Sequence, residues 1–290
     1  MPPYRGAMKP IPFDAASGDR FLATVSAFDA HPPLSGHKLD VIARQQGRVG
    51  AWADAEGICL VGVAAHHTGH GHWAVEAAVA ARRRNPAEEE AALRHVIGLV
   101  PGDQAHTLWA FREGQVEAAS RLGYTETRCV LRLSGPMSGV AHVPAAGVLI
   151  TPITKADVAT IVAINNRAFA DHREQAGMTV EAFHDLIRAE GFGAGATVVA
   201  RTQQGIVGFC VTKQDGSGVG EVYLLAVDPE FAGSGYGSML ASAGFEQLAS
   251  HDATTAVVWV DGSNHAARHV YRKLGLTEDF RNREMAPLTE

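Results

Sequence analysis

Three alternating glycines mark the stretch of this sequence that is best suited to chemistry. Gly233, Gly235 and Gly237 follow a mostly apolar run over 220–227, which predicts a buried strand, and they precede a helical pattern that starts near Ser238. Glycines let a backbone turn tightly and bring bare N–H groups close to a ligand, and a helix start adds unpaired donors and the positive end of its dipole. The stretch therefore predicts a site for an anion such as a pyrophosphate.

The spacing of these glycines excludes two common nucleotide sites. A dinucleotide fingerprint would place G-x-G-x-x-G in the first strand-turn-helix unit, and a P-loop would require Gly-Lys-Ser/Thr; this stretch has neither. It resembles the acetyl-CoA loop of the GNAT acetyltransferase superfamily, V-x-P-x-x-(Q/R)-x-x-G-x-(G/A), with Val227, Pro229, Gly235 and Gly237 at the matching places. Ala232 replaces the first Gln or Arg, which removes a side-chain contact but leaves the backbone donors. A plain glycine turn between a core strand and a helix is the alternative interpretation.

The resemblance implies that acetyl-CoA is the co-substrate, and the chemistry it implies requires no metal. In the superfamily the strand splays at its end and frees backbone groups for the pantetheine arm. The groups implied to lie along the co-substrate come from the strand end, from the glycine loop with the next helix start, and from the start of a later helix expected over 264–274. They are Leu225, Ala226, Val227, then Ala232, Gly233, Ser234, Gly235, Tyr236, Gly237, Ser238, and finally Asn264, His265, Ala266, Ala267, Arg268, His269.

Acetyl transfer from a thioester to an amine needs a neutral amine, a stabilised carbonyl oxygen and a proton for the departing thiolate. Glu221 lies at the start of the glycine-loop strand, before Val227, where a carboxylate can face the cleft and act as the base. Because an unperturbed glutamate is a weak base, we expect its pKa to be raised or its action to be relayed through water. An ion-paired acid at a strand end is the alternative interpretation.

Tyr271 is the expected acid, because it lies on the helix over 264–274 at the superfamily position from which a phenol protonates the leaving CoA thiolate. A phenol is a hydrogen-bond donor at neutral pH. An aromatic core anchor before Leu274 and Gly275 is the alternative interpretation. Since no cysteine is suitably placed as a nucleophile, we expect direct transfer without an acetyl-enzyme.

A second resemblance is more specific and covers the second half of the chain. The stretch 165–179 matches Asn-Asn-x-Ala-Phe-x-x-His-x-Glu-Gln-x-Gly-x-Thr, and together with 220–223 it resembles mycothiol synthase, an actinobacterial family of tandem GNAT domains. That family acetylates the cysteinyl amine of the small molecule Cys-GlcN-Ins to give mycothiol and CoA. The resemblance implies four substrate contacts, at Glu174, Lys213, Glu221 and Trp259. Relatives often have a tyrosine where Trp259 stands. Taken alone, Glu174 and Lys213 would each be interpreted as an ordinary solvated surface charge.

Two other functions stay open at this point. An N-acetyltransferase acting on another small amine or on a peptide N-terminus would use the same loop, and a non-catalytic acetyl-CoA-binding protein would need only the loop. Two features of the first half remain unassigned. At Gly36, within 31–37, the acid that would reach the substrate is missing, and the histidine tract 66–72 is interpreted as a polar loop although such tracts can bind metals.

Composition narrows the class of protein. A chain of 290 residues predicts two domains of about 140 residues each. The formal charge of −6 gives no basic footprint for nucleic acid, and the sequence has neither an apolar run of about 18 residues nor the apolar core of a signal peptide. Cys59, Cys129 and Cys210 are widely spaced and predict buried thiols. We therefore expect a cytoplasmic monomer without membrane or nucleic-acid partners.

The expected fold is α+β, with two tandem GNAT-like domains that each have a mixed, mostly antiparallel sheet flanked by helices. The degenerate N-terminal domain covers 10–135, a linker rich in Gly, Pro and Ser covers 136–147, and the catalytic domain covers 148–290. Within the catalytic domain, the patterns predict the element order β-α-α-β-β-β-α-β-α-β, which is the order of a GNAT domain.

The two halves echo each other, which indicates a duplicated fold. A strand glutamate, a later strand tryptophan and a helix end in the first half match three features of the second: Glu76 with Glu221, Trp109 with Trp259, and 118–124 with 269–276. The place of the glycine loop is taken by 82–90, Arg-Arg-Arg-Asn-Pro-Ala-Glu-Glu-Glu. Because carboxylates at a helix start repel a phosphate, we expect the first copy to have lost the chemistry. Whether it keeps the co-substrate stays open.

Overall fold

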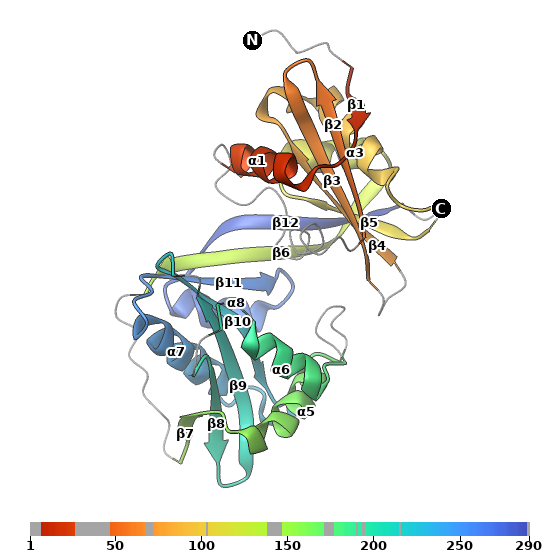
Figure 1. The fold of residues 1–290 in the computed structure, drawn as a ribbon. Coiled ribbons are helices and arrows are strands. Elements are labelled where there is room, and N and C mark those ends of the chain that lie inside the picture. Colours follow the sequence, from red (N-terminus) through yellow and green to blue (C-terminus); the bar gives the residue numbers. More distant parts are fainter. Residues whose placement is uncertain are drawn as a thin grey trace. The chain divides into compact units, whose positions relative to one another are not determined.

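A computed structural model describes residues 7–26, 47–67, 72–102, 104–137, 147–170, 177–189, 191–192, 195–214 and 216–288. The chain divides into two compact units (Figure 1): unit 1 comprises Met1–Val130 and Arg281–Glu290, and unit 2 comprises Leu131–Phe280. Two strands carry the chain from one unit to the other, β6 (Tyr124–Pro136) and β12 (Thr277–Pro287). Residues 281–290 therefore belong to unit 1, whereas the sequence assigned all of 148–290 to the second domain.

The end of β12 belongs to unit 1 because it pairs there with β5 (His106–Ala110). The pairing is antiparallel, with Arg283 opposite Ala110 and Met285 opposite Leu108. Met285 is buried in the core of unit 1. Strand periodicity predicts that a strand exists near the end of the chain but does not say which strand it will pair with, so the expected domain boundary differs from the observed one.

Unit 1 is a sheet covered by helices on both faces. The strands follow the order β1 (Lys9–Ile11), β2 (Arg48–Asp54), β3 (Gly57–His67), β4 (His72–Val79), β5, and only β4 and β5 are parallel. α3 (Pro86–Ile97) and α4 (Glu113–Arg121) pack on one face, and α1 (Ala15–Ser26) packs on the other. Alternate residues of β3 enter the two cores, as a strand buried on both faces requires.

Unit 2 has the same layered arrangement, and its expected element order is confirmed. The strands β7 (Leu149–Pro152), β8 (Thr197–Thr202), β9 (Gly205–Gln214), β10 (Val219–Val227) and β11 (Thr255–Asp261) lie side by side in that order, with only β10 and β11 parallel. α5 (Val158–Ala168) and α6 (Val180–Arg188) cover one face. α7 (Tyr236–Ala249) packs on β9 and β10 and against α8 (His265–Lys273).

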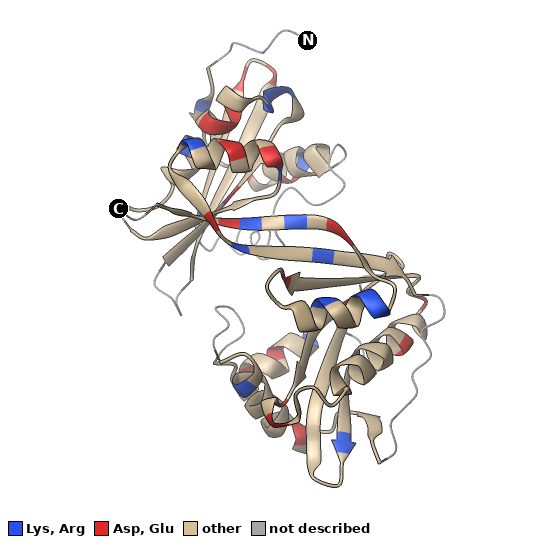
Figure 2. Cartoon of the chain, turned by 180° about the vertical axis from the view of Figure 1, so that it is seen from behind, with Lys and Arg blue, Asp and Glu red and all other residues tan. Residues whose placement is uncertain are grey.

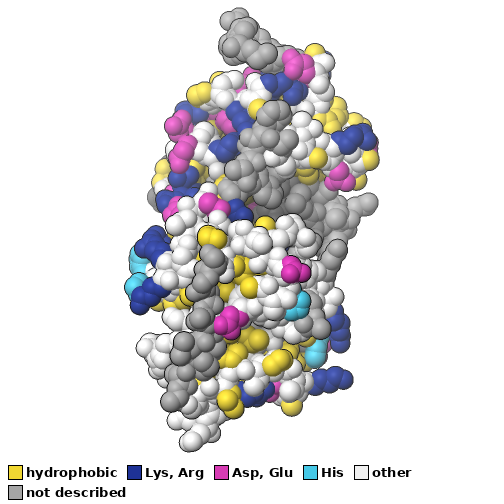
Figure 3. All heavy atoms as spheres, turned by 90° about the vertical axis from the view of Figure 1, so that its left-hand side faces the viewer, with side chains coloured by type: hydrophobic (Ala, Val, Ile, Leu, Met, Phe, Trp, Pro, Cys, Tyr) yellow, Lys and Arg dark blue, Asp and Glu magenta, His cyan; other side chains and the backbone are white. Residues whose placement is uncertain are grey.

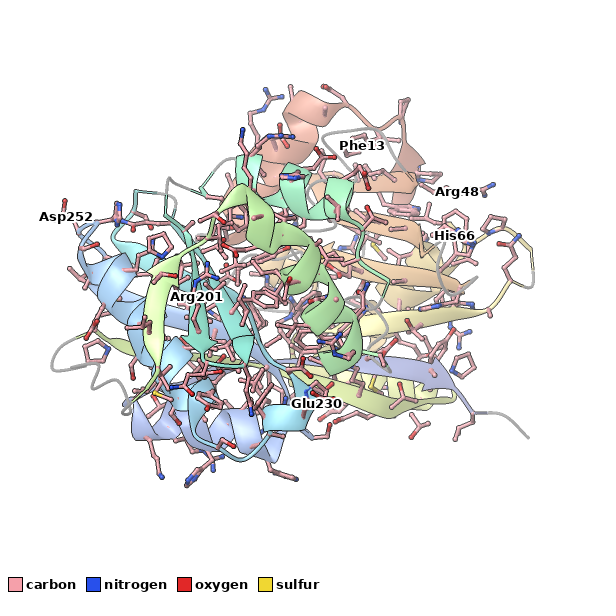
Figure 4. All side chains as sticks on the ribbon, turned by 90° about the horizontal axis from the view of Figure 1, so that it is seen from below. Phe13, Arg48, His66, Arg201, Glu230 and Asp252 are labelled. Carbon is pink, nitrogen blue, oxygen red and sulfur yellow. The ribbon has the colours of Figure 1, made fainter. Side chains whose placement is uncertain are left out.

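A capping box and an ion pair fix the short 3₁₀ helix η2 (Lys155–Asp157), which leads directly into α5. The backbone N–H and the hydroxyl of Thr154 both donate to Asp157 (2.6 and 2.7 Å). The guanidinium of Arg201, which is labelled in Figure 4, donates to the same carboxylate at 3.1 and 2.6 Å. The hydrogen bonds from Arg201 and then from Thr154 lower the pKa of Asp157 to about 2, against the effect of burial. This helix end is thereby tied to β8.

Both units contain the same hairpin. β2 with β3 and β8 with β9 each turn at a glycine with a φ of 112°, Gly57 and Gly205, and each pair has one irregularity close to the turn. A φ of this sign favours glycine, so the two turns require the same residue. Matching Gly57 to Gly205 makes Ala65 the equivalent of Lys213.

This register corrects one equivalence expected from the sequence. In unit 2 Lys213 lies opposite Glu221, and in unit 1 its equivalent Ala65 lies opposite Ala74. Ala74, not Glu76, therefore occupies the position of Glu221. The sequence match was wrong because β10 has a one-residue bulge between Val222 and Leu224, whereas the pairing of β4 with β3 runs without a shift.

The equivalence of the two tryptophans is confirmed by the neighbouring strands. Val75 of β4 and Val222 of β10 are equivalent in the register set by the hairpins. Trp109 directly follows the β5 partner of Val75, and Trp259 directly follows the β11 partner of Val222. The duplication therefore extends across the parallel strand pair of each unit.

Most apolar side chains in the described ranges are buried in these cores. The large exceptions among the described residues are Leu149, Tyr223, Trp259 and Leu288, and on the face drawn in Figure 3 hydrophobic side chains occur in small groups among polar ones. In the described part of the chain, none of the helices is both long and apolar enough to cross a membrane. Tyr223 and Trp259 are therefore the exposed aromatic side chains on the two parallel strands of unit 2.

Candidate active site

The glycine loop ends in a helix start that has no side-chain cap. The short 3₁₀ helix η3 (Pro229–Phe231) follows β10, and α7 begins at Tyr236 with Gly235 as its N-cap residue. Gly233 and Gly235 have φ values of 78° and 85°, which favour glycine, and Gly235 supplies no side-chain acceptor for the N–H groups of the first turn. Residues 232–235 are exposed. The expected backbone cradle for an anion is thus open to a ligand.

The two parallel strands part beside this loop. β10 pairs with β11 from Val219 opposite Thr255 to Val222 opposite Val258, and β10 then continues to Val227 paired with β9 on its other side. The bulge at Tyr223 lies where the parallel pairing ends. The edge of β10 that faces β11 is therefore released over Leu225–Val227, which are the residues implied to bind the pantetheine arm.

Glu221 lies at the other end of β10, directly opposite Lys213 of β9. Burial raises the pKa of the Glu221 carboxyl, and the positive charges of Lys213 and Arg132 only partly oppose this shift. A carboxylate with a raised pKa holds a proton more tightly than an ordinary glutamate does. A raised pKa makes this carboxylate a stronger base than an ordinary glutamate, which suits the general base that the resemblance implies.

Tyr271 lies on α8, whose start is fixed by the side chain of Asn264, which accepts a hydrogen bond from the Ala267 N–H (3.0 Å). Tyr271 is 5% exposed, and burial raises the pKa of its phenol further above the ordinary value of a tyrosine, with Cys210 adding to the shift. Tyr271 is therefore a neutral phenol that can donate a hydrogen bond at physiological pH. Burial also raises the pKa of the Cys210 thiol to about 12, which disfavours the thiolate that a nucleophile would need.

The residues implied to contact the substrate lie in different surroundings, and one of them is outside the described residues. Lys213 borders a pocket of about 360 Å³ that also touches Gly191, Phe192 and Gln214. Trp259 is 42% exposed and contacts Phe280 edge-to-face, with ring centroids 5.9 Å apart. Glu174 and Gly36 lie outside the described residues, as do 68–71 of the histidine tract.

Two aromatic residues beside Glu221 were missed by the sequence reasoning. Tyr223, the bulge residue, meets Phe192 edge-to-face with centroids 5.1 Å apart, and the Lys213 ammonium lies 5.7 Å from the centroid of Phe192. Tyr223 is 43% exposed. The bulge turns an aromatic side chain outward next to Glu221, and alternation along the strand could not reveal this because it assumes an unbroken register.

The remaining implied co-substrate residues follow the loop and the start of α8. Ala232, Gly233, Ser234 and Gly235 form the loop, and Tyr236, Gly237 and Ser238 form the first turn of α7. His265, Ala266, Ala267, Arg268 and His269 form the first turns of α8 after Asn264. The guanidinium of Arg268 donates to the Gly262 carbonyl (2.7 Å), so it is already engaged within its own turn. The last turn of α8 carries Arg272 and Lys273; basic residues are coloured blue on the ribbon in Figure 2.

Comparison with known proteins decides the family. The model of the acetyltransferase (GNAT) family matches residues 159–276. A mycothiol acetyltransferase from Kocuria rhizophila is 34% identical to this chain over 275 residues, which cover 86% of this chain and 88% of that protein. The chain belongs to the mycothiol acetyltransferase family. The family resemblance based on 165–179 and 220–223 is thereby confirmed.

Other members of the mycothiol acetyltransferase family match a shorter part. The protein from Propionibacterium freudenreichii is 35% identical over 58% of this chain, and the one from Tsukamurella paurometabola is 37% identical over 57% of it. These two alignments span 57% and 61% of the relatives' own length. The chain thus covers less than two thirds of these relatives in such matches, although the match to the Kocuria protein is nearly complete.

Solved structures show the fold. A GCN5-related N-acetyltransferase from Sphaerobacter thermophilus superposes with a TM-score of 0.73 at 17% identity, covering 99% of this chain and 98% of that one. A tandem GNAT protein from the clavulanic acid biosynthesis pathway superposes with a TM-score of 0.67 at 15% identity, covering 96% of this chain and 98% of that one. The expected α+β fold of tandem GNAT domains is confirmed.

Proposed function

We propose that unit 2 transfers the acetyl group of acetyl-CoA to the cysteinyl amine of Cys-GlcN-Ins, giving mycothiol and CoA. The observation that carries the proposal is the arrangement along one strand, β10. Its end opens into an uncapped glycine loop suited to a diphosphate, and its start carries Glu221 with a raised pKa. Family membership supplies the acceptor, since the relatives are named mycothiol acetyltransferases.

In the proposed reaction Glu221 takes a proton from the ammonium form of the acceptor, directly or through water. The neutral amine nitrogen attacks the thioester carbonyl carbon, and a C–N bond forms while the C–S bond breaks. The departing thiolate of CoA takes the phenol proton of Tyr271, and solvent returns the tyrosine to its neutral form. A backbone N–H of the released strand edge stabilises the carbonyl oxygen. The residues proposed to contact acetyl-CoA and the substrate are those that the resemblance implies.

We propose that the protein acts as a monomer in the cytoplasm and that its reaction needs no metal. The three cysteines are free, and Cys59 and Cys210 are buried, which suits a reducing compartment. Among the described residues there is no group of three or more His, Cys, Asp or Glu that would hold a metal ion. The chemistry proposed for Glu221 and Tyr271 is proton transfer only, so it is complete without a Lewis acid.

Release of CoA tests the choice of acceptor. With acetyl-CoA present, Cys-GlcN-Ins is expected to release CoA at least tenfold faster than GlcN-Ins, which lacks the cysteinyl amine, or than free cysteine, which lacks the sugar. The comparison reads kcat/KM from a thiol-release assay and mass spectrometry of the product. Equal rates for the three amines, or a faster rate for an unrelated peptide N-terminus, would assign the site to another acceptor.

A further inference from the structure

Unit 1 repeats the strand, short turn and helix that form the anion site of unit 2. The backbone N–H of Ala80, just past β4, donates to the backbone carbonyl of Cys59 (2.9 Å). In the same way the N–H of Asp228, just past β10, donates to the backbone carbonyl of Val207 (2.9 Å). η1 (Ala81–Arg83) and α3 follow in unit 1 where η3 and α7 follow in unit 2. The two sites can therefore be compared position by position.

The start of α3 is closed by its own chain. Asn85 is the N-cap residue, with a φ of −130°, and its side chain accepts from the Glu88 N–H at 3.2 Å. Pro86 has no N–H to offer. Glu88 and Glu89 place two carboxylates in the first turn, at the positive end of the helix dipole; acidic residues are coloured red on the ribbon in Figure 2. A diphosphate would meet few free donors and two like charges.

The three arginines before α3 are engaged within unit 1. Arg83 is 1% exposed and donates to Asp54 (3.0 Å) and to Glu88 (2.5 Å). Arg82 pairs with Asp54 and with Glu56, at 2.8 and 3.0 Å. Arg84 donates to the Val79 carbonyl (3.0 Å), so its guanidinium binds the end of β4 itself. The cations that could attract a phosphate are thus neutralised or held by neighbouring residues.

A side chain also fills the gap between the parallel strands. Gln115 of α4 is fully buried; its amide donates to the Ala77 carbonyl of β4 (3.1 Å) and accepts from the Phe111 N–H (3.0 Å), just past the end of β5. Ala77 lies opposite Gly62, as Leu225 lies opposite Cys210, so Ala77 is the equivalent of Leu225. In unit 1 an internal amide therefore satisfies the backbone group that unit 2 leaves for the pantetheine arm.

The two proton-transfer groups are missing as well. Ala74 stands at the position of Glu221. At the end of α4 the N–H of Leu122 donates to the backbone carbonyls of Ala118 and Ala119. At the end of α8 the N–H of Leu274 donates in the same pattern to the backbone carbonyls of Val270 and Tyr271. Ala119 is therefore the equivalent of Tyr271, and both alanines are buried. Methyl groups replace the carboxylate and the phenol.

We infer that unit 1 binds no acetyl-CoA, because its own side chains occupy the groups that such a ligand would need, and that the chain binds one acetyl-CoA, in unit 2. A ligand entering unit 1 would have to break the buried Gln115 bridge and the ion pairs of Arg83, and it would leave those polar groups unpaired. The inference rests on the proposed function only for the identity of the ligand.

Calorimetric titration of the full-length chain with acetyl-CoA tests the inference. One equivalent is expected, and hydrogen exchange of the same complex is expected to show new protection in 225–238 and none in 77–90. In the variant Gly235→Val, binding is expected to weaken by at least tenfold. A second equivalent, protection in 77–90, or undiminished binding by Gly235→Val would overturn the inference.

Two further outcomes separate this inference from the proposed function. Absence of any binding to the wild-type chain would overturn the proposed function and the stoichiometry of one acetyl-CoA per chain, but it would agree with a closed unit 1. One equivalent whose protection falls only in 77–90 would overturn both. Because the exchange measurement uses the wild-type chain, the inference can be tested even where Gly235→Val does not fold.

Discussion

Replacing Gly235 with valine is expected to weaken acetyl-CoA binding by at least tenfold. Gly235 has a φ of 85°, a conformation that a β-branched residue adopts only with strain, so the loop must change its backbone to admit the side chain. No atom lies within 4 Å of the added Cβ, which means that the effect comes from the backbone and not from a clash. Isothermal titration with acetyl-CoA measures the loss.

Gly205→Val is the matched control for this substitution. Gly205 has a φ of 112° and also has open space around its Cβ, but it lies in the turn between β8 and β9. Both variants are expected to lose stability, by roughly 1–3 kcal/mol, because both force a branched residue into a positive φ. Only the loop variant should lose the ligand. Equal losses of affinity in both would mean that global destabilisation, not the anion cradle, explains the result.

Replacing Glu221 with glutamine is expected to lower kcat at least tenfold and to leave acetyl-CoA affinity nearly unchanged. Glutamine keeps the shape of the side chain but cannot accept the proton of the acceptor ammonium, and general bases typically contribute about 10²–10⁴-fold. Glu181→Gln, at an exposed position in the first turn of α6, is the control and should keep wild-type rates. A variant of Glu221 that loses acetyl-CoA binding instead would reveal a structural role.

The pH profile gives this substitution a second measurement. Because burial raises the pKa of Glu221, the carboxylate is lost at a higher pH than an ordinary glutamate, whose pKa is about 4.3. The kcat of the wild-type chain should therefore fall as the pH is lowered through that raised value, and the fall should be absent from Glu221→Gln. An acidic limb that persists unchanged in the variant would assign the titration to another group.

The sequence predicted the glycine loop because its chemistry is local. A strand, three glycines and a helix start are neighbours in the chain, so spacing alone reveals that backbone donors converge. The capping residues Thr154, Thr179 and Asn264 are local signals of the same kind, since each acts on its own helix. The element order of unit 2 followed from these local signals.

What the sequence could not reveal depends on pairing between distant strands. The bulge at Tyr223 adds one residue to a strand that is mostly apolar on both of its faces. An extra residue therefore leaves no visible break in the hydrophobic pattern. That residue shifted the match between the two copies and led to Glu76, where the register gives Ala74. The last strand was likewise predicted as an element, but its partner β5 lies more than a hundred positions earlier in the chain.

The contacts beside Glu221 were hidden for a related reason. Phe192 belongs to no helix or strand, and its meeting with Tyr223 and Lys213 requires the loop, the bulge and β9 to be placed together. In unit 1 the sequence did suggest a lost phosphate site from its acidic run. It gave no sign that Gln115 bridges β4 to the end of β5, because that contact joins α4 to a strand far away in sequence.

A single-turnover rapid quench with labelled acetyl-CoA and Cys-GlcN-Ins most directly tests whether unit 2 hands its acetyl group straight to the cysteinyl amine. Label is expected to leave acetyl-CoA and enter mycothiol at the same rate, CoA is expected to be released in step, and no labelled protein is expected to accumulate. Labelled protein that forms before the product, or label that never reaches the amine of Cys-GlcN-Ins, would contradict direct transfer to the cysteinyl amine.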